Sequence, residues 1–341
     1  MTRDDGGMPT IADLDSLATR YAQLKEQVRR VVVGQHETVE HLLVAVFCQG
    51  HTLIIGVPGL AKTMLVRTLA SSLALEFRRI QFTPDMMPSD ILGAELIQTD
   101  PVTNQRRMQF VPGPVFANIV LADEINRTPP KTQAALLEAM AERQVSVGGV
   151  TRPLDPPFIV VATQNPIEQE GTYPLPEAQL DRFMFALKMD YPTVQEERYI
   201  VGQSEEISAR TAEVRPLFDG HELVRLRRAI GRVPVSEHVV EYAVSLARAT
   251  RPDDASCPAS VSKYIAWGAG PRTGQALILG ARCLAALEGQ PTPGAEHVMR
   301  IAPAVLRHRL VLNYTASAER VGTEEVLARL LKSVGQPAYK S

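Results

Sequence analysis

A short apolar run, a glycine-containing loop and a helical segment follow one another between residues 52 and 74, and this succession most constrains the fold. The run at 52–55 is typical of a buried strand, and residues 56–63 read Gly-Val-Pro-Gly-Leu-Ala-Lys-Thr. Glycines let backbone N–H groups turn inward around a phosphate, and the start of a helix adds its positive dipole end. A lysine adds a full charge, and a threonine hydroxyl can bind Mg²⁺. The sequence therefore predicts a phosphate-binding loop with the residues Gly56, Val57, Pro58, Gly59, Leu60, Ala61, Lys62, Thr63 and Met64.

The loop departs from the strict pattern G-x-x-x-x-G-K-[ST] at one position, because Ala61 stands where the second glycine belongs. Alanine is tolerated there only if its φ is negative, which a position about to enter a helix allows. A plain turn with a chance Lys-Thr pair is the alternative on this loop alone. Other residues must decide between the two.

Two later strand-like runs end in polar residues that suit nucleotide chemistry. The run at 119–122 is followed by Asp123, which would hold Mg²⁺, and Glu124, which would orient and deprotonate an attacking water. After the run at 158–162, Asn165 could contact both a γ-phosphate and that water. Taken singly, the acids could cap a helix and Asn165 could be a turn residue. Three such strand ends in order fit the rule that ligands bind at the carboxyl ends of parallel strands.

Strand-like runs alternate with helical segments until about residue 191, which indicates an α/β fold with a mostly parallel sheet covered on both sides. Beyond that point helices are separated by Pro, Gly and Asp clusters, and no further strong strand is indicated. We expect a flexible tail at 1–10, an α/β core at 11–191 and an all-helical domain at 192–341. The predicted strands lie at 52–55, 79–82, 119–122, 158–162 and 183–187. A helix at 37–47 precedes them, and helices at 64–74 and 131–143 are among the segments between them.

Composition limits the classes of function. With 36 Lys+Arg against 38 Asp+Glu, the net charge of -2 provides no basic field for a phosphate backbone, so nucleic acid is disfavoured as a partner. Cys48, Cys257 and Cys283 are far apart and form no C-x-x-C pair, which argues against a structural zinc site or a disulfide framework. No apolar stretch reaches the roughly 18 residues of a membrane span. We expect a soluble, cytoplasmic protein without membrane insertion.

Taken together, the motifs resemble the MoxR family of AAA+ ATPases, in the clade with an insertion in the second helix of the core. The resemblance covers roughly residues 30–330 and includes the loop at 56–63, where this family tolerates alanine. It implies an AAA+ P-loop NTPase core with a parallel five-stranded sheet, a C-terminal helical lid, and ATP and Mg²⁺ as cofactors. Its other specific strings are Leu-Ala-Asp-Glu-Ile-Asn-Arg-Thr-Pro-Pro-Lys-Thr-Gln at 121–133, Ala-Thr-Gln-Asn-Pro at 162–166 and Glu-Gly-Thr-Tyr-Pro-Leu-Pro-Glu-Ala-Gln-Leu-Asp-Arg-Phe at 170–183.

The resemblance also implies roles for residues outside these strand ends. Arg182 matches the arginine finger that projects into the ATP site of a neighbouring subunit, although a salt bridge with Asp181 or a nearby acid is an alternative. Arg272 matches the sensor 2 position, from which the lid detects the γ-phosphate. Gly34 and Gln35 resemble the loop on the adenine side.

Two hairpins are expected within the core. Residues 93–112 resemble the inserted hairpin of the clade, with a turn at 100–104 and two basic residues, Arg106 and Arg107. A second hairpin is expected at 144–153. Either hairpin could face a central pore and contact a client, or pack between subunits.

The expected activity is Mg²⁺-dependent ATP hydrolysis by a homo-oligomeric ring, a hexamer, that remodels or activates a client protein. The resemblance implies a partner with a von Willebrand factor A domain. The catalytic residues would be Lys62, Glu124, Asn165 and Arg182, with Thr63 and Asp123 as metal ligands.

Three other functions stay open. One is the ATPase subunit of a metal chelatase, which shares this core. Another is a DNA-dependent motor, for which the arginines at 225–228 offer a local basic patch. A non-hydrolysing nucleotide-binding scaffold is the third, and Glu124, Asn165 and Arg182 argue against it.

Overall fold

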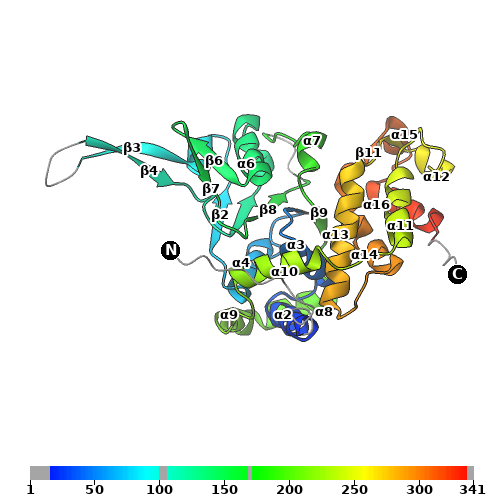
Figure 1. Cartoon of the computed structure of the whole chain (residues 1–341), viewed down its shortest axis with the longest axis horizontal. Coiled ribbons are helices and arrows are strands. Elements are labelled where there is room, and N and C mark those ends of the chain that lie inside the picture. The colour runs from blue at the N-terminus through cyan, green and yellow to red at the C-terminus, as the bar shows by residue number, and fades with distance from the viewer. Residues whose placement is uncertain (1–15, 100–105, 168–170, 336–341) are drawn as a thin grey trace.

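The computed structural model describes residues 16–99, 106–167 and 171–335. Five strands form one sheet in the order β2-β5-β8-β1-β9, and each adjacent pair is parallel (Figure 1). The predicted five-stranded parallel sheet is therefore confirmed. The tail expected at residues 1–10 lies outside the described residues. The strands are β1 (Thr52–Gly56), β2 (Phe77–Gln81), β5 (Ile119–Asp123), β8 (Ile159–Gln164) and β9 (Phe185–Met189).

Helices cover both faces of the sheet because successive strand residues point to opposite sides. Ile54, Leu121 and Val161 belong to the apolar cluster that includes residues of the first three described helices. Their neighbours Leu53, Val120 and Val160 belong to a second cluster on the other face, with residues of α6. The helices of the core are α2 (Leu17–Val31), α3 (His36–Phe47), α4 (Lys62–Ser72), α5 (Pro88–Leu92), α6 (Pro130–Glu142) and α7 (Glu177–Leu180), with the 3-10 turn η1 (Ile125–Arg127).

Both predicted hairpins are present. The first, β3 (Gly93–Thr99) with β4 (Arg106–Pro112), protrudes from the core, and the second is β6 (Gln144–Val147) with β7 (Val150–Pro153) (Figure 1). The turn expected at 100–104 lies outside the described residues.

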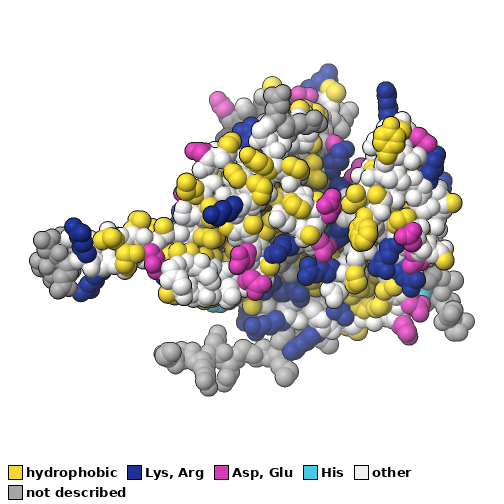
Figure 2. All heavy atoms as spheres, turned by 90° about the horizontal axis from the view of Figure 1, so that it is seen from above, with side chains coloured by type: hydrophobic (Ala, Val, Ile, Leu, Met, Phe, Trp, Pro, Cys, Tyr) yellow, Lys and Arg dark blue, Asp and Glu magenta, His cyan; other side chains and the backbone are white. Residues whose placement is uncertain are grey.

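Arg152 joins the two hairpins. Its guanidinium carbon lies 3.8 Å from the ring centroid of Phe110, and its Nη2 atom lies 3.7 Å from Oε1 of Glu95. Farther along the first hairpin, Ile97 and Met108 are paired across the strands and exposed. Figure 2 shows hydrophobic side chains along this projection. The base of the hairpin is therefore anchored, whereas its outer part presents apolar side chains to solvent.

The chain after β9 is mostly helical, as predicted, apart from a short antiparallel pair, β10 (Ile265–Trp267) and β11 (Val311–Leu312). Strands this short leave no recognisable pattern in a sequence. No helix in the described ranges is long and apolar enough to cross a membrane. The helices are α8 (Val194–Gly202), α9 (Ser204–Ala212), α10 (Gly220–Ile230), α11 (Glu237–Arg248), α12 (Ala259–Ser262), α13 (Pro271–Leu287), α14 (Ala295–Leu306), α15 (Tyr314–Ala318) and α16 (Thr323–Ser333), with the 3-10 turn η2 (Arg307–Arg309).

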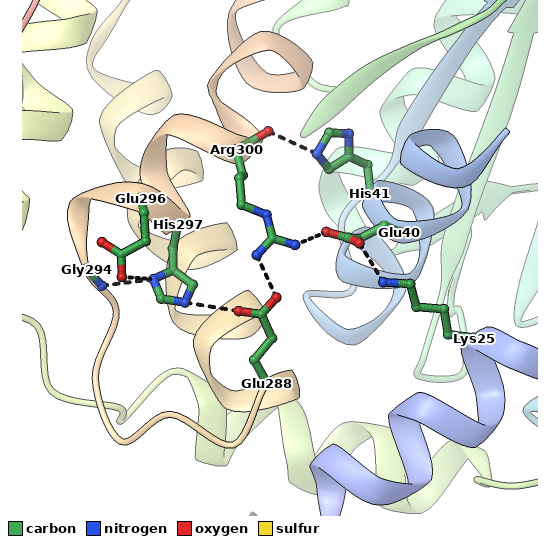
Figure 3. A network of polar contacts seen from close by, with 8 residues as sticks. All are labelled: Lys25, Glu40, His41, Glu288, Gly294, Glu296, His297 and Arg300. Atoms are coloured by element: carbon green, nitrogen blue, oxygen red, sulfur yellow. Dashed lines mark hydrogen bonds and ion pairs between the residues drawn. The ribbon is translucent and has the colours of Figure 1, made fainter.

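The helical part, which is the chain after β9, packs directly against the core. One apolar cluster runs from the sheet through α3 into α13 and α14. A polar network crosses the same boundary: Glu40 of α3 accepts from Lys25 Nζ at 2.7 Å and pairs with Arg300 of α14 (Figure 3). Arg300 Nη1 also donates to Glu288 Oε1 at 2.6 Å, and its carbonyl oxygen lies 3.1 Å from His41 Nε2. These contacts fix the position of the helical part in this conformation.

Candidate nucleotide site

The predicted phosphate loop lies at the carboxyl edge of the sheet, because β1 ends at Gly56 and α4 begins at Lys62. Gly59 has a φ of +85°, a conformation that favours glycine. Gly56 is needed for space, since an added Cβ would come 3.0 Å from the carbonyl oxygen of Met189. Lys62 Nζ donates to the Gly56 carbonyl at 2.6 Å. The loop thus has the strand–loop–helix context that phosphate binding requires.

The prediction that Ala61 has a negative φ is wrong. Its φ is +56° and its ψ is 24°, which is the left-handed region. Ala61 immediately precedes α4, and its carbonyl oxygen accepts the N–H of Leu65 at 2.9 Å. The left-handed turn therefore leads the loop into the first helical hydrogen bond, at a cost of about 1–2 kcal/mol for a residue with a Cβ.

A mostly apolar cavity of about 260 Å³ opens beside the phosphate loop. One wall contains Val33 and Gln35, and the loop contributes Leu60. The lining also includes Ile200 of α8 and Ile207 of α9, which the sequence prediction missed. A mostly apolar cavity next to a phosphate loop is suited to a nucleotide base.

The loop expected on the adenine side has the backbone of a tight turn. Gly34 has a φ of +72°, and Gln35 has a φ of +53°. A Cβ on Gly34 would lie 2.8 Å from Oε1 of Glu196, which caps the start of α8 with Thr193. Gln35 Nε2 donates to the Asp190 carbonyl at 2.6 Å. Gln35 lines the cavity, and its role on the adenine side of a nucleotide stays a prediction.

The two acids at the end of β5, Asp123 and Glu124, are held by the neighbouring strand. Thr163 of β8 donates its hydroxyl to Asp123 Oδ1 at 2.6 Å and accepts the backbone N–H of Glu124 at 2.9 Å. The Glu124 carboxylate accepts from Gln81 Nε2 at 2.9 Å and lies 3.2 Å from Arg127 Nε. Thr163 is thus a positioning residue that the sequence prediction missed.

Asp123 has a second strong partner on the other side. Its Oδ2 atom accepts from Arg79 Nε at 3.0 Å and from Arg79 Nη2 at 2.6 Å. Arg79 lies on β2, the edge strand next to β5. No sequence pattern selects this arginine, because its partner is 44 positions away in the chain.

The donor set fits Mg²⁺ bound together with a nucleotide. Asp123 presents one carboxylate at the strand end, and Thr63 presents a hydroxyl in the first turn of α4. Throughout the described ranges, no three or more His, Cys, Asp or Glu side chains gather as a metal cage. Mg²⁺ in nucleotide sites takes one or two protein ligands and completes its shell with phosphate oxygens and water, so this sparse set suits it.

Asn165 is buried directly after β8. Gln164 pairs with Ile55, so Asn165 leaves the sheet at the level of the phosphate loop. Its Oδ1 atom accepts the N–H of Ile167 at 3.2 Å, which is a turn contact. The interpretation of Asn165 as a turn residue is confirmed, and its contact with a γ-phosphate and an attacking water stays a prediction.

Arg182 lies at the amino ends of the strands, whereas the phosphate loop lies at their carboxyl ends. Phe185, the first residue of β9, pairs with Thr52, the first residue of β1, so Arg182 precedes the amino ends of the strands. A five-residue strand places about 17 Å between that edge and the phosphate loop of the same chain. Arg182 Nη1 donates to the Leu137 carbonyl at 2.7 Å, whereas Asp181 pairs with other arginines. The alternative of an Arg182–Asp181 salt bridge is therefore not what the structure has.

Arg272 lies near the same edge as Arg182. Its Nη1 atom is 3.6 Å from Asp181 Oδ2, and Asp181 Oδ1 accepts from Arg309 Nε at 2.8 Å. As a contact to the nucleotide of its own chain, Arg272 is misplaced in this conformation. The assignment of Arg272 to a nucleotide site stays a prediction, for the site of a neighbouring subunit or for its own site after a movement of the helical part.

The fold defines the class of protein before any relative is considered. A phosphate loop after the first core strand, an acid pair after the third and a helical domain after the fifth characterise a P-loop ATPase of the AAA+ type. Residues 51–185 match the ATPase family associated with various cellular activities (AAA), and residues 258–330 match the AAA lid domain.

Relatives narrow the class to one family. The chain is 43% identical to Chaperone MoxR1 of Mycobacterium tuberculosis over 91% of this chain and 81% of that protein. It is 29% identical to Protein MoxR of Methylorubrum extorquens over 96% and 98% of the two chains. A crystal structure of a presumed ATPase from Cytophaga hutchinsonii superposes with a TM-score of 0.85 at 37% identity, covering 96% and 98%. The chain belongs to the MoxR family of AAA+ ATPases.

Proposed function

We propose that this chain is a Mg²⁺-dependent ATPase that assembles as a hexameric ring and remodels or activates a client protein. The observation that carries the proposal is the meeting of three strand ends at one edge of the sheet, with a base-sized cavity beside them. The family to which the chain belongs, and the description of one relative as a chaperone, support the client-directed part.

Each residue at this edge has a role that its position supports. Lys62 would exchange the Gly56 carbonyl for the β- and γ-phosphate oxygens. Glu124, oriented by Gln81 and Thr163, would position and deprotonate the attacking water, and Asn165 would hold that water against the γ-phosphate. Thr63 and Asp123 would hold the Mg²⁺ ion, which neutralises charge on the phosphate oxygens when bound.

A ring is proposed because the site is incomplete within one chain. Arg182 and Arg272 lie beyond the far edge of the sheet, about 17 Å from the chain's own phosphate loop by strand length. A second copy would bring both arginines to the γ-phosphate of its neighbour. Arginine fingers of this kind raise hydrolysis rates by about 10³- to 10⁵-fold in other nucleotide hydrolases.

Recognition of the client is assigned to surfaces outside the ATP site. The protruding hairpin β3–β4, with exposed Ile97 and Met108, is a candidate contact for the client. A partner with a von Willebrand factor A domain is proposed from the family alone. The free cysteines, Cys48, Cys257 and Cys283, favour the reducing cytoplasm as the compartment.

Two variants test the ATPase proposal. Lys62→Ala should abolish binding of a fluorescent ATP analogue, because the loop loses its charge. Glu124→Gln should bind the analogue normally but release phosphate at least about 100-fold more slowly, because the water loses its base. Glu142→Gln, at the exposed end of α6, is the matched control and should behave like wild type. Normal turnover by Glu124→Gln would contradict the acid's role, and a wild-type protein that binds no ATP would contradict the whole proposal.

A further inference from the structure

Arg79 makes a close contact with the carboxylate proposed to hold the metal. Its side chain leaves β2 and reaches across to Asp123 on β5, the next strand of the sheet. Gln81 is directly opposite Asp123, so Arg79 is its diagonal neighbour on the same face. Two guanidinium nitrogens donate to one oxygen, Asp123 Oδ2, at 3.0 and 2.6 Å. The Arg79 side chain is 44% exposed, whereas that of Asp123 is 11% exposed.

This contact completes the polar environment of Asp123 within the protein. Oδ1 is taken by the Thr163 hydroxyl at 2.6 Å, and Oδ2 is taken by Arg79. A carboxylate that is mostly buried at a strand end needs a cation, since an unpaired buried charge is costly. The guanidinium supplies that cation where the nucleotide-bound site would have Mg²⁺.

A guanidinium beside a magnesium carboxylate has a predictable electrostatic effect. It gives Asp123 a counter-ion before the metal arrives, and it repels a divalent cation that approaches the same oxygens. The partial exposure of Arg79 weakens this effect through solvent screening but also lets the side chain swing away from β5. A Mg²⁺ ion that binds Asp123 must therefore displace the Arg79 guanidinium or bind close to its positive charge.

We propose that Arg79 is an internal competitor of Mg²⁺ at Asp123, and that it sets the Mg²⁺ concentration at which the nucleotide site fills. Arg79 holds the carboxylate in place while the site is empty and yields it when Mg²⁺ and nucleotide bind together. The inference rests on the proposed function, because it takes the edge near Asp123 as the metal–nucleotide site. Arg79 is a positioning residue in this scheme.

The adjacent arginine shows what an ordinary surface contact on this strand looks like. Arg78 points to the other face of β2, where its Nη2 atom lies 2.9 Å from Glu76 Oε1. Both of those side chains are more than half exposed, so the pair contributes little. Arg78 and Arg79 thus carry the same charge on the same strand, but one of them alone faces the acid pair. Arg78→Gln is therefore a matched control for Arg79→Gln.

The test is a Mg²⁺ titration of nucleotide binding. Wild type, Arg79→Gln and Arg78→Gln are mixed with a fluorescent ATP analogue, and the Mg²⁺ concentration for half-maximal binding is measured. Arg79→Gln should reach half-maximal binding at about threefold to tenfold less Mg²⁺ than wild type, because the competing charge is gone. Arg78→Gln should match wild type. An unchanged or higher Mg²⁺ requirement in Arg79→Gln would overturn the inference, as would an equal shift in Arg78→Gln.

A second measurement covers the risk that Arg79→Gln folds poorly. Arg79→Lys keeps the charge but loses the fork of donors, so its Mg²⁺ midpoint should stay within about twofold of wild type. A shift in Arg79→Lys as large as that expected for Arg79→Gln would show that charge is not the cause. Thermal unfolding adds a readout without turnover: Mg²⁺ with ADP should stabilise Arg79→Gln more than it stabilises wild type.

Failure of this inference can be told from failure of the proposed function. Wild-type protein that binds no nucleotide at any Mg²⁺ concentration would contradict the proposed function itself. Wild-type protein that binds nucleotide equally well with EDTA would leave nucleotide binding intact and overturn the competition between Arg79 and Mg²⁺.

Discussion

Residues with a left-handed backbone are found in three segments of the site. Gln35, Ala61 and Glu124 have φ values of +53°, +56° and +58°, although none is glycine. Each such residue costs about 1–2 kcal/mol, so the surroundings must hold it there. At Glu124, the Thr163 hydroxyl accepts the backbone N–H at 2.9 Å. Strain of this kind is typical of functional positions, and here it is found in the cavity lining, in the phosphate loop and at the acid pair. Gln49, Ala74, Arg143 and Arg320 adopt the same backbone outside the site.

The strain at Ala61 can be measured by removing its Cβ. Ala61→Gly should raise the free energy of unfolding by about 1 kcal/mol, because glycine adopts this backbone without a clash. Nucleotide affinity should change little, since the loop keeps its shape. Urea denaturation monitored by circular dichroism measures the first effect, and binding of a fluorescent ATP analogue measures the second.

The control for Ala61→Gly is the same substitution in a right-handed helix. Ala328 is exposed in the middle of α16, so Ala328→Gly should lower the free energy of unfolding by about 0.5–1 kcal/mol. If both variants lose stability equally, Ala61 is not held in the left-handed region in solution.

At the scale of elements, His51 ties the start of β1 to two neighbours. Its Nδ1 atom accepts the N–H of Val160 in β8 at 3.0 Å. The other ring nitrogen, Nε2, then carries the hydrogen and donates to the Met140 carbonyl of α6 at 3.1 Å. The ring is neutral in this arrangement, and it is buried. A protonated ring would lose its acceptor and break the link to β8.

Burial lowers the pKa of His51 to about 4, against about 6.5 for a free histidine. As pH falls below about 6.5, His51 binds a proton in the unfolded chain but not in the folded chain. The free energy of unfolding therefore decreases until about pH 4. The total loss from this residue is about 3 kcal/mol. Chemical denaturation at several pH values should show a shallower decrease for His51→Gln, whose amide can accept and donate but does not titrate.

The comparison of slopes isolates His51 from other groups. Burial also lowers the pKa of His41 and His308, so wild type and variant share those contributions. Equal pH slopes for wild type and His51→Gln between pH 6.5 and 4 would show that His51 is protonated in the folded state.

Most elements of the core could be predicted from sequence, and the errors have local causes. Buried parallel strands are short and apolar on both faces, so β1, β5 and β8 were located within a residue or two. The edge strand β2 was predicted two residues late, because it exposes Arg78 and Arg79 and lacks a continuous apolar run. β9 was predicted two residues early. Phe183 and Met184 are apolar because they are buried where the backbone meets η2, not because they belong to the strand.

The parts of the site that sequence could not predict are contacts between distant positions. Arg79 meets Asp123 and Thr163 meets Asp123 because strand order and register put them side by side. Ile200 and Ile207 line the cavity only because α8 and α9 fold back beside the phosphate loop. The residue types at a strand end predict its chemistry. Contacts between side chains on different strands depend on the strand order and register, which a single sequence does not reveal.

At the scale of the whole molecule, the helical part supports the edge that carries Arg182. Three consecutive residues of η2 bind the backbone that precedes and begins β9. Arg307 Nη1 donates to the Ala186 carbonyl at 2.6 Å, and His308 Nε2 lies 2.9 Å from the Phe183 carbonyl. Arg309 Nη2 donates to the same Phe183 carbonyl at 2.8 Å. Because Arg272 also contacts Asp181, the neighbour of Arg182 in the chain, we expect the two arginines to act together on one neighbouring site.

Mixing inactive variants tests whether this surface serves a neighbour. Arg182→Ala and Glu124→Gln should each be nearly inactive alone. In a mixed ring, some sites combine an intact Glu124 with an intact Arg182 from the next subunit. Random mixing at equal amounts makes about a quarter of the sites complete, so phosphate release should recover toward that fraction of wild type. The same recovery is expected for Arg272→Ala mixed with Glu124→Gln.

Mixing Arg182→Ala with Arg272→Ala then distinguishes the two possible placements of Arg272. If both arginines act on the same neighbouring site, every interface in this mixture lacks one of them, and activity should stay at the level of the single variants. If Arg272 instead contacted the nucleotide of its own chain, about a quarter of the sites would be complete and activity would return. Recovery in this mixture would show that the helical part leaves the position seen here during turnover, because Arg272 would have to cross from Asp181 to the opposite edge of the sheet.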